Sequence, residues 1–166
     1  SGASTQWTVA LFDRKGGFER LEIEPGVFEH PRMSPDGKHI AFGSDDGKEA
    51  IVWIYDLASA SAPRRLTFEG RNRFPVWSAD SQRVAFQSDR GGDLGIFWQR
   101  ADGTGTAERL TTAEKGTAHI PESWAPDITR FLYTSATDQT TTLFAFSVAD
   151  KKATPFGDVR SPVNRI

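Results

Sequence analysis

Apolar residues recur along this chain in short stretches that are separated by polar, glycine-containing segments. Within many stretches the apolar and polar side chains alternate, and the apolar ones are mostly Phe, Ile, Val or Tyr. Alternation with a period of two and enrichment in aromatic and β-branched residues are typical of β-strands. Examples are Ile40-Ala41-Phe42, Val84-Ala85-Phe86 and Phe131-Leu132-Tyr133. The pattern therefore predicts an all-β chain of short strands joined by turns.

The same order of stretches and turns occurs three times. Asp36, Asp80 and Asp127 mark equivalent turns and are 44 and 47 residues apart. A period of about 40–50 residues is that of a four-stranded β-propeller blade. The third repeat has one residue more than the others between Pro121 and Trp124, and we expect a β-bulge to absorb it.

Aromatic residues mark two further positions in the repeat. Trp53, Phe97 and Phe144 each stand eleven residues after an aromatic residue of the preceding stretch. Trp77 and Trp124 share a second position, close before the turn. Because these positions recur with the repeat, we interpret them as packing positions between blades rather than as a binding surface.

The repeats predict one β-propeller domain over residues 1–166, built from four-stranded antiparallel blades. Full blades are expected over residues 28–68, 72–112 and 118–157. We expect the remaining ends to be half-blades: the outer strands of an incomplete blade over 5–24, and the first strand of a further blade over 158–166.

The predicted blades do not complete a ring. Propellers cover the faces of their blades by closing a ring, typically of four to eight blades. About three and a half blades leave a face open at each end, so the chain is either part of a longer protein or associates with a second copy. We expect a homodimer, in which the broken blades complete each other, if this chain is expressed alone.

The first repeat resembles a known family. Ser34-Pro35-Asp36-Gly37-Lys38, Ile40-Ala41-Phe42, Trp53-Ile54-Tyr55-Asp56-Leu57 and Arg65-Leu66-Thr67 are similar to the TolB-like, WD-like β-propeller repeat. The second copy departs from it at Ala79 and Ser81, and the third at Ile128 and Thr129. The resemblance covers most of the chain and is nearest to the extracytoplasmic propellers of bacterial serine/threonine kinases.

The resemblance implies a range of functions, because one propeller fold hosts unrelated activities. The repeat occurs in the periplasmic propeller of the Tol-Pal system, in sensor regions of bacterial kinases and in propellers of prolyl-oligopeptidase-type peptidases. Our first hypothesis is a non-enzymatic module that binds a protein or peptide partner in a periplasmic or other extracytoplasmic location. The alternatives are an accessory propeller of a peptidase or kinase, or a polysaccharide lyase built on the propeller itself.

Composition and charge exclude several other classes. The chain has 12 Phe and 5 Trp in 166 residues, too much aromatic mass for a disordered segment. Its formal net charge of -2 gives no positive field for nucleic acid. No apolar run approaches the length of about 18 residues that indicates membrane insertion. The absence of cysteine excludes disulfides and thiol nucleophiles.

Motifs for catalysis and metal binding are also missing from the sequence. There is no Gly-x-Ser-x-Gly elbow and no kinase HRD or DFG signature. His30, His39 and His119 lie far apart without paired-ligand spacing, and Asp45-Asp46-Gly47 lacks the ligand ladder of a calcium loop. We therefore expect no catalytic residues, no metal site and no cofactor.

The candidate binding residues stand where the first strand of each blade begins. Glu29, Arg73, His119 and Arg160 each precede a proline by two residues, and first strands line the central channel of a propeller. They predict a mixed-charge ring that captures a peptide terminus or an anionic group; the alternative is that they only solvate the channel. Trp7, in the incomplete blade, is a candidate exposed aromatic for a partner.

Overall fold

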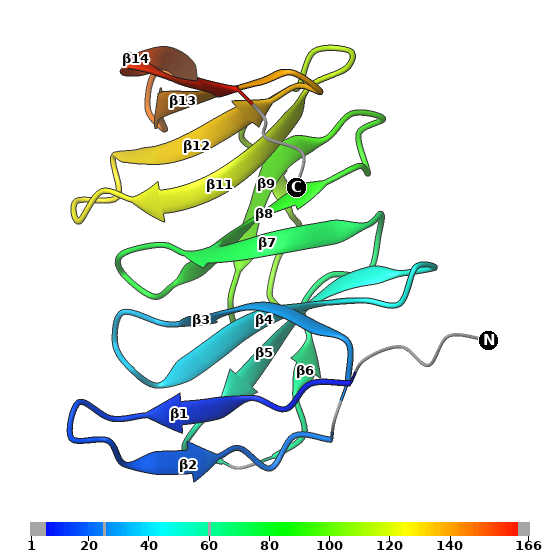
Figure 1. Cartoon of the computed structure of the whole chain (residues 1–166), viewed down its shortest axis with the longest axis vertical. Coiled ribbons are helices and arrows are strands. Elements are labelled where there is room, and N and C mark those ends of the chain that lie inside the picture. The colour runs from blue at the N-terminus through cyan, green and yellow to red at the C-terminus, as the bar shows by residue number, and fades with distance from the viewer. Residues whose placement is uncertain (1–5, 25, 60, 163–166) are drawn as a thin grey trace.

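The computed structural model of the chain describes residues 6–24, 26–59 and 61–162, and these form strands and turns with no helix (Figure 1). Their strands make one two-stranded and three four-stranded antiparallel sheets, each in chain order. The sheets follow one another along the long axis of the molecule, from the N-terminal to the C-terminal end. The predicted fragment of a β-propeller is confirmed.

Each four-stranded sheet is one blade. The first blade contains β3 (Phe28–Met33), β4 (His39–Asp45), β5 (Ala50–Asp56) and β6 (Arg64–Arg65). The second contains β7 (Asn72–Trp77), β8 (Arg83–Ser88), β9 (Gly95–Arg100) and β10 (Glu108–Arg109). The third contains β11 (Ala118–Trp124), β12 (Arg130–Ala136), β13 (Thr140–Ser147) and β14 (Lys152–Pro162).

The two-stranded sheet, β1 (Ala10–Phe12) and β2 (Phe18–Arg20), is an incomplete blade. Its first pair, Ala10 opposite Arg20, matches the pair Trp53 and Arg65 of β5 and β6. The hydrogen bond from the Leu21 amide to the Val9 carbonyl (3.1 Å) likewise matches the bond from Leu66 to Val52 (2.9 Å). β1 and β2 therefore correspond to the third and fourth strands of a blade.

The C-terminal end differs from our expectation. Residues 158–166 were expected to begin a further blade, but β14 continues to Pro162 and pairs with β13 in the third blade, Arg160 opposite Thr142. The pairing is interrupted between Thr142 and Phe144 and then resumes. The open edge of β13 offers unpaired backbone groups, which this segment satisfies. Residues 163–166 lie outside the described residues.

Aromatic side chains pair across the second and third strands of every blade. Phe42 lies opposite Trp53, Phe86 opposite Phe97, and Tyr133 opposite Phe144. In the third blade the two rings stack with centroids 5.3 Å apart. Cross-strand aromatic pairs of this kind stabilise antiparallel sheets, and their repetition explains the eleven-residue spacing in the sequence.

The backbone of the turn between the first and second strands is alike in each blade, because the amides of Gly37, Ser81 and Ile128 donate to the carbonyls of Ser34, Ser78 and Ala125. A serine hydroxyl also closes the turn in the first two blades, whereas the third blade has Ala125 at that position. Ser34 donates its hydroxyl to the Asp36 carboxylate (2.6 Å) and accepts from the His39 amide (2.9 Å). The turn ends on a residue with left-handed backbone, Gly37 at φ 71°. The other blades place Ser81 and Ile128 in this conformation, at φ 60° and 56°, where a side chain is strained.

The hydrophobic core lies between successive sheets. One cluster joins Val9, Leu21 and Ile23 to the first blade. A second joins the first and second blades around the fully buried Leu66 and Phe86, and a third joins the second and third blades around Ile96 and Phe131. Each blade is thus buried by its neighbours rather than by a core of its own.

Candidate functional site

The first strands of the three blades, β3, β7 and β11, lie side by side and form one wall, the inner strands (Figure 1). Each contains a β-bulge at which two of its residues face one residue of the next strand. The bulge residues are His30 and Pro31, Phe74 and Pro75, and Pro121 and Glu122. A bulge is therefore common to all three blades and is not a consequence of the extra residue in the third.

The first two bulges hold their aromatic residue in the left-handed region of the backbone. His30 has φ 49° and Phe74 has φ 56°, although neither is glycine. Their rings pack on each other with centroids 4.8 Å apart and planes inclined by 58°. Strained backbone of this kind persists only where the surroundings fix it, and it is concentrated at functional positions.

In the third blade, the residue predicted for the ring of channel residues does not occupy the position equivalent to the others. Glu29 lies opposite Gly43 and Arg73 opposite Gln87, which are equivalent positions. The third blade has Ile120 there, opposite Thr134. His119 stands one position earlier, where the second blade has Asn72. The reason is the extra residue: it moves Pro121 by one position relative to Pro75, so counting back from proline aligns the wrong residues.

Arg73 is held by the preceding blade. Its Nε donates to Oδ2 of Asp45 (2.8 Å), its Nη2 pairs with the same oxygen, and Arg71 donates to Asp45 from Nη2 (2.9 Å). Arg71 also donates from Nη1 to the Gly47 carbonyl (2.9 Å). The two guanidinium groups share one carboxylate and keep about a third of their side-chain surface exposed, so this cluster carries a net positive charge that solvent reaches.

The charge of Asp45 is secured by its neighbours. Burial of the Asp45 carboxyl alone would raise its pKa. The Gly47 amide and the guanidinium groups of Arg73 and Arg71 outweigh that effect and hold the pKa below its ordinary value. Asp45 therefore stays ionised and orients both arginines. A second carboxylate that binds them would find both guanidinium groups already oriented.

His119 is a structural residue between the second and third blades. Its side chain is buried, its Nδ1 lies 2.9 Å from the Thr111 hydroxyl, and its ring packs against Tyr133. The Gln87 side chain donates to its carbonyl (2.8 Å), and its amide donates to the Leu94 carbonyl (2.9 Å). Burial lowers its pKa, and the negative charges of Asp93 and Glu114 oppose this only in part.

Arg160 does not lie on the inner strands. Its backbone belongs to β14, the fourth strand of the third blade. Of the four predicted residues, the structure therefore places Glu29 and Arg73 at one equivalent position, His119 beside it in the core, and Arg160 at the opposite edge of its sheet.

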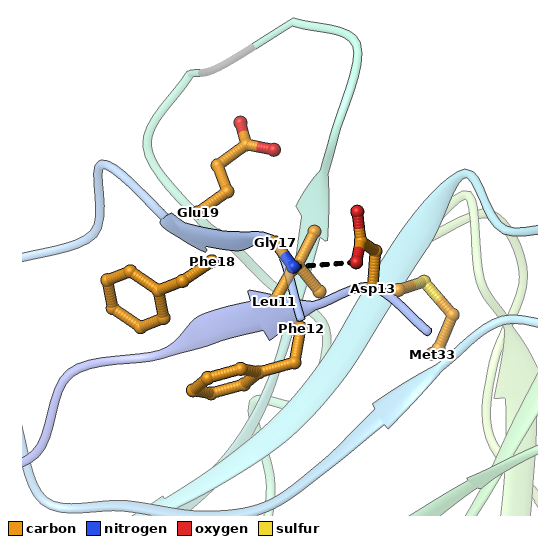
Figure 2. A pocket seen from close by; sticks show the side chains of 7 residues that line it. All are labelled: Leu11, Phe12, Asp13, Gly17, Phe18, Glu19 and Met33. Atoms are coloured by element: carbon orange, nitrogen blue, oxygen red, sulfur yellow. Dashed lines mark hydrogen bonds between the residues drawn. The ribbon is translucent and has the colours of Figure 1, made fainter. Parts of the chain in front are cut away.

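The incomplete blade has an exposed aromatic end. Trp7 is 59% exposed and pairs its backbone with Gly26 through two hydrogen bonds of 2.7 and 3.1 Å. Phe12 and Phe18 are exposed by 74% and 62% and pack on each other with centroids 5.0 Å apart. Both residues line a depression of about 420 Å³. Figure 2 shows their rings and, close by, the turn in which the Gly17 amide donates a hydrogen bond to the Asp13 carboxylate (2.7 Å).

Residues 6–24, 26–59 and 61–162 contain no candidate metal centre. No group of three or more histidine or acidic side chains there is arranged to hold a cation. The same residues include no helix with the length and hydrophobicity of a membrane span.

Two parts of the surface were missed in the sequence. In the sequence Asp45 stands out only as part of an acidic turn, because its contact with Arg73 crosses from one blade to the next. In the sequence Phe12 and Phe18 have the pattern of strand residues, and that pattern does not show that both side chains are exposed. The incomplete alternation around Leu11 and Phe12 was the only available signal for the second pair.

The chain belongs to the TolB β-propeller domain family, whose sequence model matches residues 3–159. This agrees with the open stack of four-stranded blades and with the repeat in the sequence. The solved structure of a putative TolB from Agrobacterium tumefaciens superimposes with a TM-score of 0.74 and 22% identity, over 89% of this chain and 55% of that one.

Two curated relatives align with parts of the chain. The uncharacterized peptidase YuxL of Bacillus subtilis is 29% identical over 103 residues, which are 58% of this chain and 15% of that protein. The Tol-Pal system protein TolB of Alcanivorax borkumensis is 39% identical over 64 residues, which are 37% of this chain and 14% of that protein. The chain spans only a minor part of both relatives.

Proposed function

We propose that this chain is a non-enzymatic propeller module that binds a protein or peptide partner, and that the partner's anionic group docks at the Arg71 and Arg73 cluster. The observation that carries the proposal is the pair of partly exposed guanidinium groups that share one carboxylate, that of Asp45. Arginine recognises carboxylates through paired N–H donors, and the known contacts of Arg73 use only Nε and Nη2. A peptide C-terminus supplies the matching group.

The bulges beside this cluster support the same surface. His30 and Phe74 present two rings that pack on each other next to Arg73, and Glu29 stands at the position equivalent to Arg73 in the first blade. A peptide that places its carboxylate on Arg73 would lay its last side chain against these rings and its backbone N–H groups toward Glu29. The surface thus offers both an anion contact and an apolar contact, as peptide sites do.

Similarity to the Tol-Pal protein TolB supports an extracytoplasmic, periplasmic location and a protein partner. No cofactor, nucleic acid or membrane insertion is part of this proposal. When the chain is alone, we propose that two copies associate through the incomplete blade of one and the third blade of the other. The exposed Phe12 and Phe18 at one end and Phe156 at the other favour this arrangement.

A second candidate function is an accessory propeller that filters substrates for a peptidase. The similarity to the peptidase YuxL favours it over the kinase sensor and the polysaccharide lyase. In that case the same surface would meet peptides on their way to a catalytic domain. Both functions predict peptide binding by this chain, and only the second predicts that a linked catalytic domain depends on it.

The test is a titration of the ¹⁵N-labelled chain with acetyl-Gly-Gly-Phe, whose C-terminus is a free carboxylate, and with its amidated counterpart. We expect saturable shifts of residues 71–75 with the free acid and at least about tenfold weaker binding of the amide, since a charge-assisted pair is lost. Arg73→Gln should abolish the difference. Chromatography of the same samples should show the peptide uncleaved.

The matched control is Arg100→Gln, which removes an exposed arginine that also pairs with an aspartate, Asp102. It should leave binding unchanged. Equal binding of acid and amide, or equal effects of the two arginine variants, would contradict the proposed site. Cleavage of the peptide would contradict the non-enzymatic assignment.

A further inference from the structure

A small cavity of about 210 Å³ lies between the first and second blades. The first blade contributes Asp36, His39, Ile54 and Arg64 to its lining, and the second blade contributes the turns that follow β7 and β9. The cavity is at the end of β4 that begins with His39, whereas Asp45 and the Arg73 cluster lie at the other end of that strand. Both walls are complete four-stranded sheets, so the cavity does not depend on either end of the chain.

The equivalent place between the second and third blades is filled by side chains. The strand pairings make Ile54 equivalent to Trp98, His39 to Arg83, and Arg64 to Glu108. Arg83 lies over the Trp98 ring, 4.2 Å from its centroid, and the indole Nε1 donates to Glu108 (3.1 Å). Arg83 and Glu108 also form an ion pair (3.6 Å). Ring, cation and anion satisfy one another there, whereas the smaller Ile54 leaves its place open.

Two opposite charges at the cavity have no ion-pair partner in the described part of the chain. Neither Asp36 nor Arg64 takes part in an ion pair there, with each other or with another side chain. Arg64 donates from Nη2 to the Ala101 carbonyl, and its Nε and Nη1 have no acceptor among the described residues. Asp36 accepts from the Ser34 hydroxyl (2.6 Å) and the Lys38 amide (3.1 Å) through Oδ1 alone. One edge of each charged group is therefore available to a ligand.

Asp36 carries its negative charge at neutral pH. The Ser34 hydroxyl and the Lys38 amide hold the pKa of its carboxyl below the ordinary value. The second carboxylate of the lining, Asp102, is paired with Arg100 (2.7 Å) and adds no unpaired charge. The cavity thus presents one anion and one cation that are both unpaired.

The remaining lining sets the size and the apolar part of a ligand. Ile54 is 4% exposed and forms an apolar floor, beside the half-buried ring of His39. A cavity of roughly 150 Å³ holds a benzene ring, so one of about 210 Å³ has room for about eight non-hydrogen atoms. Valine has that size, and its ammonium and carboxylate groups are separated by one carbon. Sites that combine an apolar floor with a few polar groups are typical of small-molecule binding.

We propose that this cavity binds a free zwitterionic α-amino acid with a short apolar side chain: its carboxylate on Arg64, its ammonium group on Asp36 and its side chain on Ile54. The Gln82 side chain, which also lines the cavity, has no hydrogen-bond partner in the described part of the chain and supplies a neutral donor and acceptor. This is a small-molecule site, and it goes beyond the proposed binding of a peptide at Arg73.

The test is a titration of the ¹⁵N-labelled chain with L-valine, N-acetyl-L-valine and L-valinamide. The acetylated compound lacks the ammonium group, and the amide lacks the carboxylate. We expect saturable binding of L-valine at millimolar concentration, with shifts at His39, Gln82 and Ala101. Each analogue should bind at least about tenfold more weakly, because one charge-assisted contact is lost.

Three variants of the cavity assign the contacts. Arg64→Gln and Asp36→Asn should each weaken the binding of L-valine by about tenfold or more. Asparagine keeps a side-chain oxygen for the contacts with Ser34 and Lys38, so the turn is retained. Ile54→Trp copies the filled place at Trp98 and should abolish binding.

Two matched controls should bind L-valine like the unchanged chain. Arg65→Gln changes the neighbouring arginine, which pairs with Glu49 (3.7 Å). Asp127→Asn changes the equivalent turn of the third blade, where the carboxylate accepts from the Thr129 amide (3.0 Å). Dispersed spectra of each variant show that the fold is kept.

Several results would overturn the inference. These are no binding at millimolar L-valine, equal affinity of L-valine and either analogue, or unchanged binding in Arg64→Gln. Shifts confined to residues 71–75 would place the valine carboxylate at the Arg73 cluster and would also refute it. The three compounds are compared on the unchanged chain, so the outcome does not depend on the folding of any variant. The peptide titration is followed at residues 71–75, so failure here leaves that test unaffected.

Discussion

The Trp77 indole donates a hydrogen bond of 2.9 Å to the carbonyl oxygen of Arg32 in the preceding blade. Trp124, at the same position one blade later, instead stacks on Trp98 with centroids 5.3 Å apart and planes 8° from parallel. Its Nε1 is buried, and it has no acceptor in the described part of the chain. Two equivalent tryptophans thus stabilise their interfaces by different means.

Replacing each tryptophan by phenylalanine should separate the contribution of the hydrogen bond from that of ring packing. Trp77→Phe loses a hydrogen bond and leaves the Arg32 carbonyl unpaired, so we expect a loss of about 2–4 kcal/mol in the free energy of unfolding. Trp124→Phe removes a donor that is already unpaired, and its cost should be about 1 kcal/mol smaller. Urea unfolding measures both. Equal costs would show that the hydrogen bond contributes nothing.

The turn of the third blade offers a stabilising substitution. Ile128 has φ 56°, a conformation that disfavours β-branched residues, at the position where the first blade has Gly37. Ile128→Gly should raise the free energy of unfolding by about 1 kcal/mol, because the strain in the folded state exceeds the added entropy of glycine in the unfolded chain. The reverse change, Gly37→Ile, should lower it. A destabilising Ile128→Gly would mean that the side chain packs usefully.

Replacing Asp45 should destabilise the chain more than replacing either arginine that it binds. Asp45→Asn leaves two guanidinium groups facing each other between blades, so we expect a loss of about 1–3 kcal/mol. Arg73→Gln leaves Asp45 paired with Arg71 and should cost about 1 kcal/mol or less, since Arg73 is partly exposed. Thermal unfolding at low and high salt checks the order, and added salt should reduce the difference.

Acid should destabilise the interface between the second and third blades. Because burial lowers the pKa of His119 in the folded chain, the unfolded chain binds the proton more readily. This contribution is complete above the ordinary histidine value of 6.5 and is lost as the pH falls below it. The free energy of unfolding should therefore fall as the pH is lowered from 7 to 5. This fall should be smaller in the His119→Gln variant. An unchanged slope would contradict this assignment.

Much of the fold could be predicted from the sequence, because the same local pattern occurs three times. The pairs around Trp53, Phe97 and Phe144 and the correspondence of Trp77 with Trp124 were all expected from spacing. The bulge of the third blade was expected between Pro121 and Trp124 and lies there, but the bulges of the first two blades were not expected, since a bulge is set by the register between strands. His119 was misaligned for that reason: spacing from proline does not show where the register shifts.

The candidate site was less accessible to sequence analysis. The contact of Arg73 with Asp45 joins residues that are 28 positions apart and belong to two blades. An arginine or an aspartate in a sequence does not show which residue it pairs with. Phe156 stands at the position where the other blades bury Leu66 and Leu110, and an apolar residue at all three positions gives no sign in the sequence that only Phe156 is exposed. Both features depend on how blades meet, and that geometry is set by packing and not by the local pattern.

The placement of the core between the sheets has a consequence for how the molecule comes apart. A blade with its own core would unfold alone, but here the stability of each sheet depends on its packing against the next one, as in other repeat proteins. Unfolding should begin at the two outermost sheets, where one side has no neighbour, and advance inward one interface at a time. Amide exchange should therefore be slowest in β7, β8 and β9, and a ligand that caps either end would slow the exchange of every strand behind it.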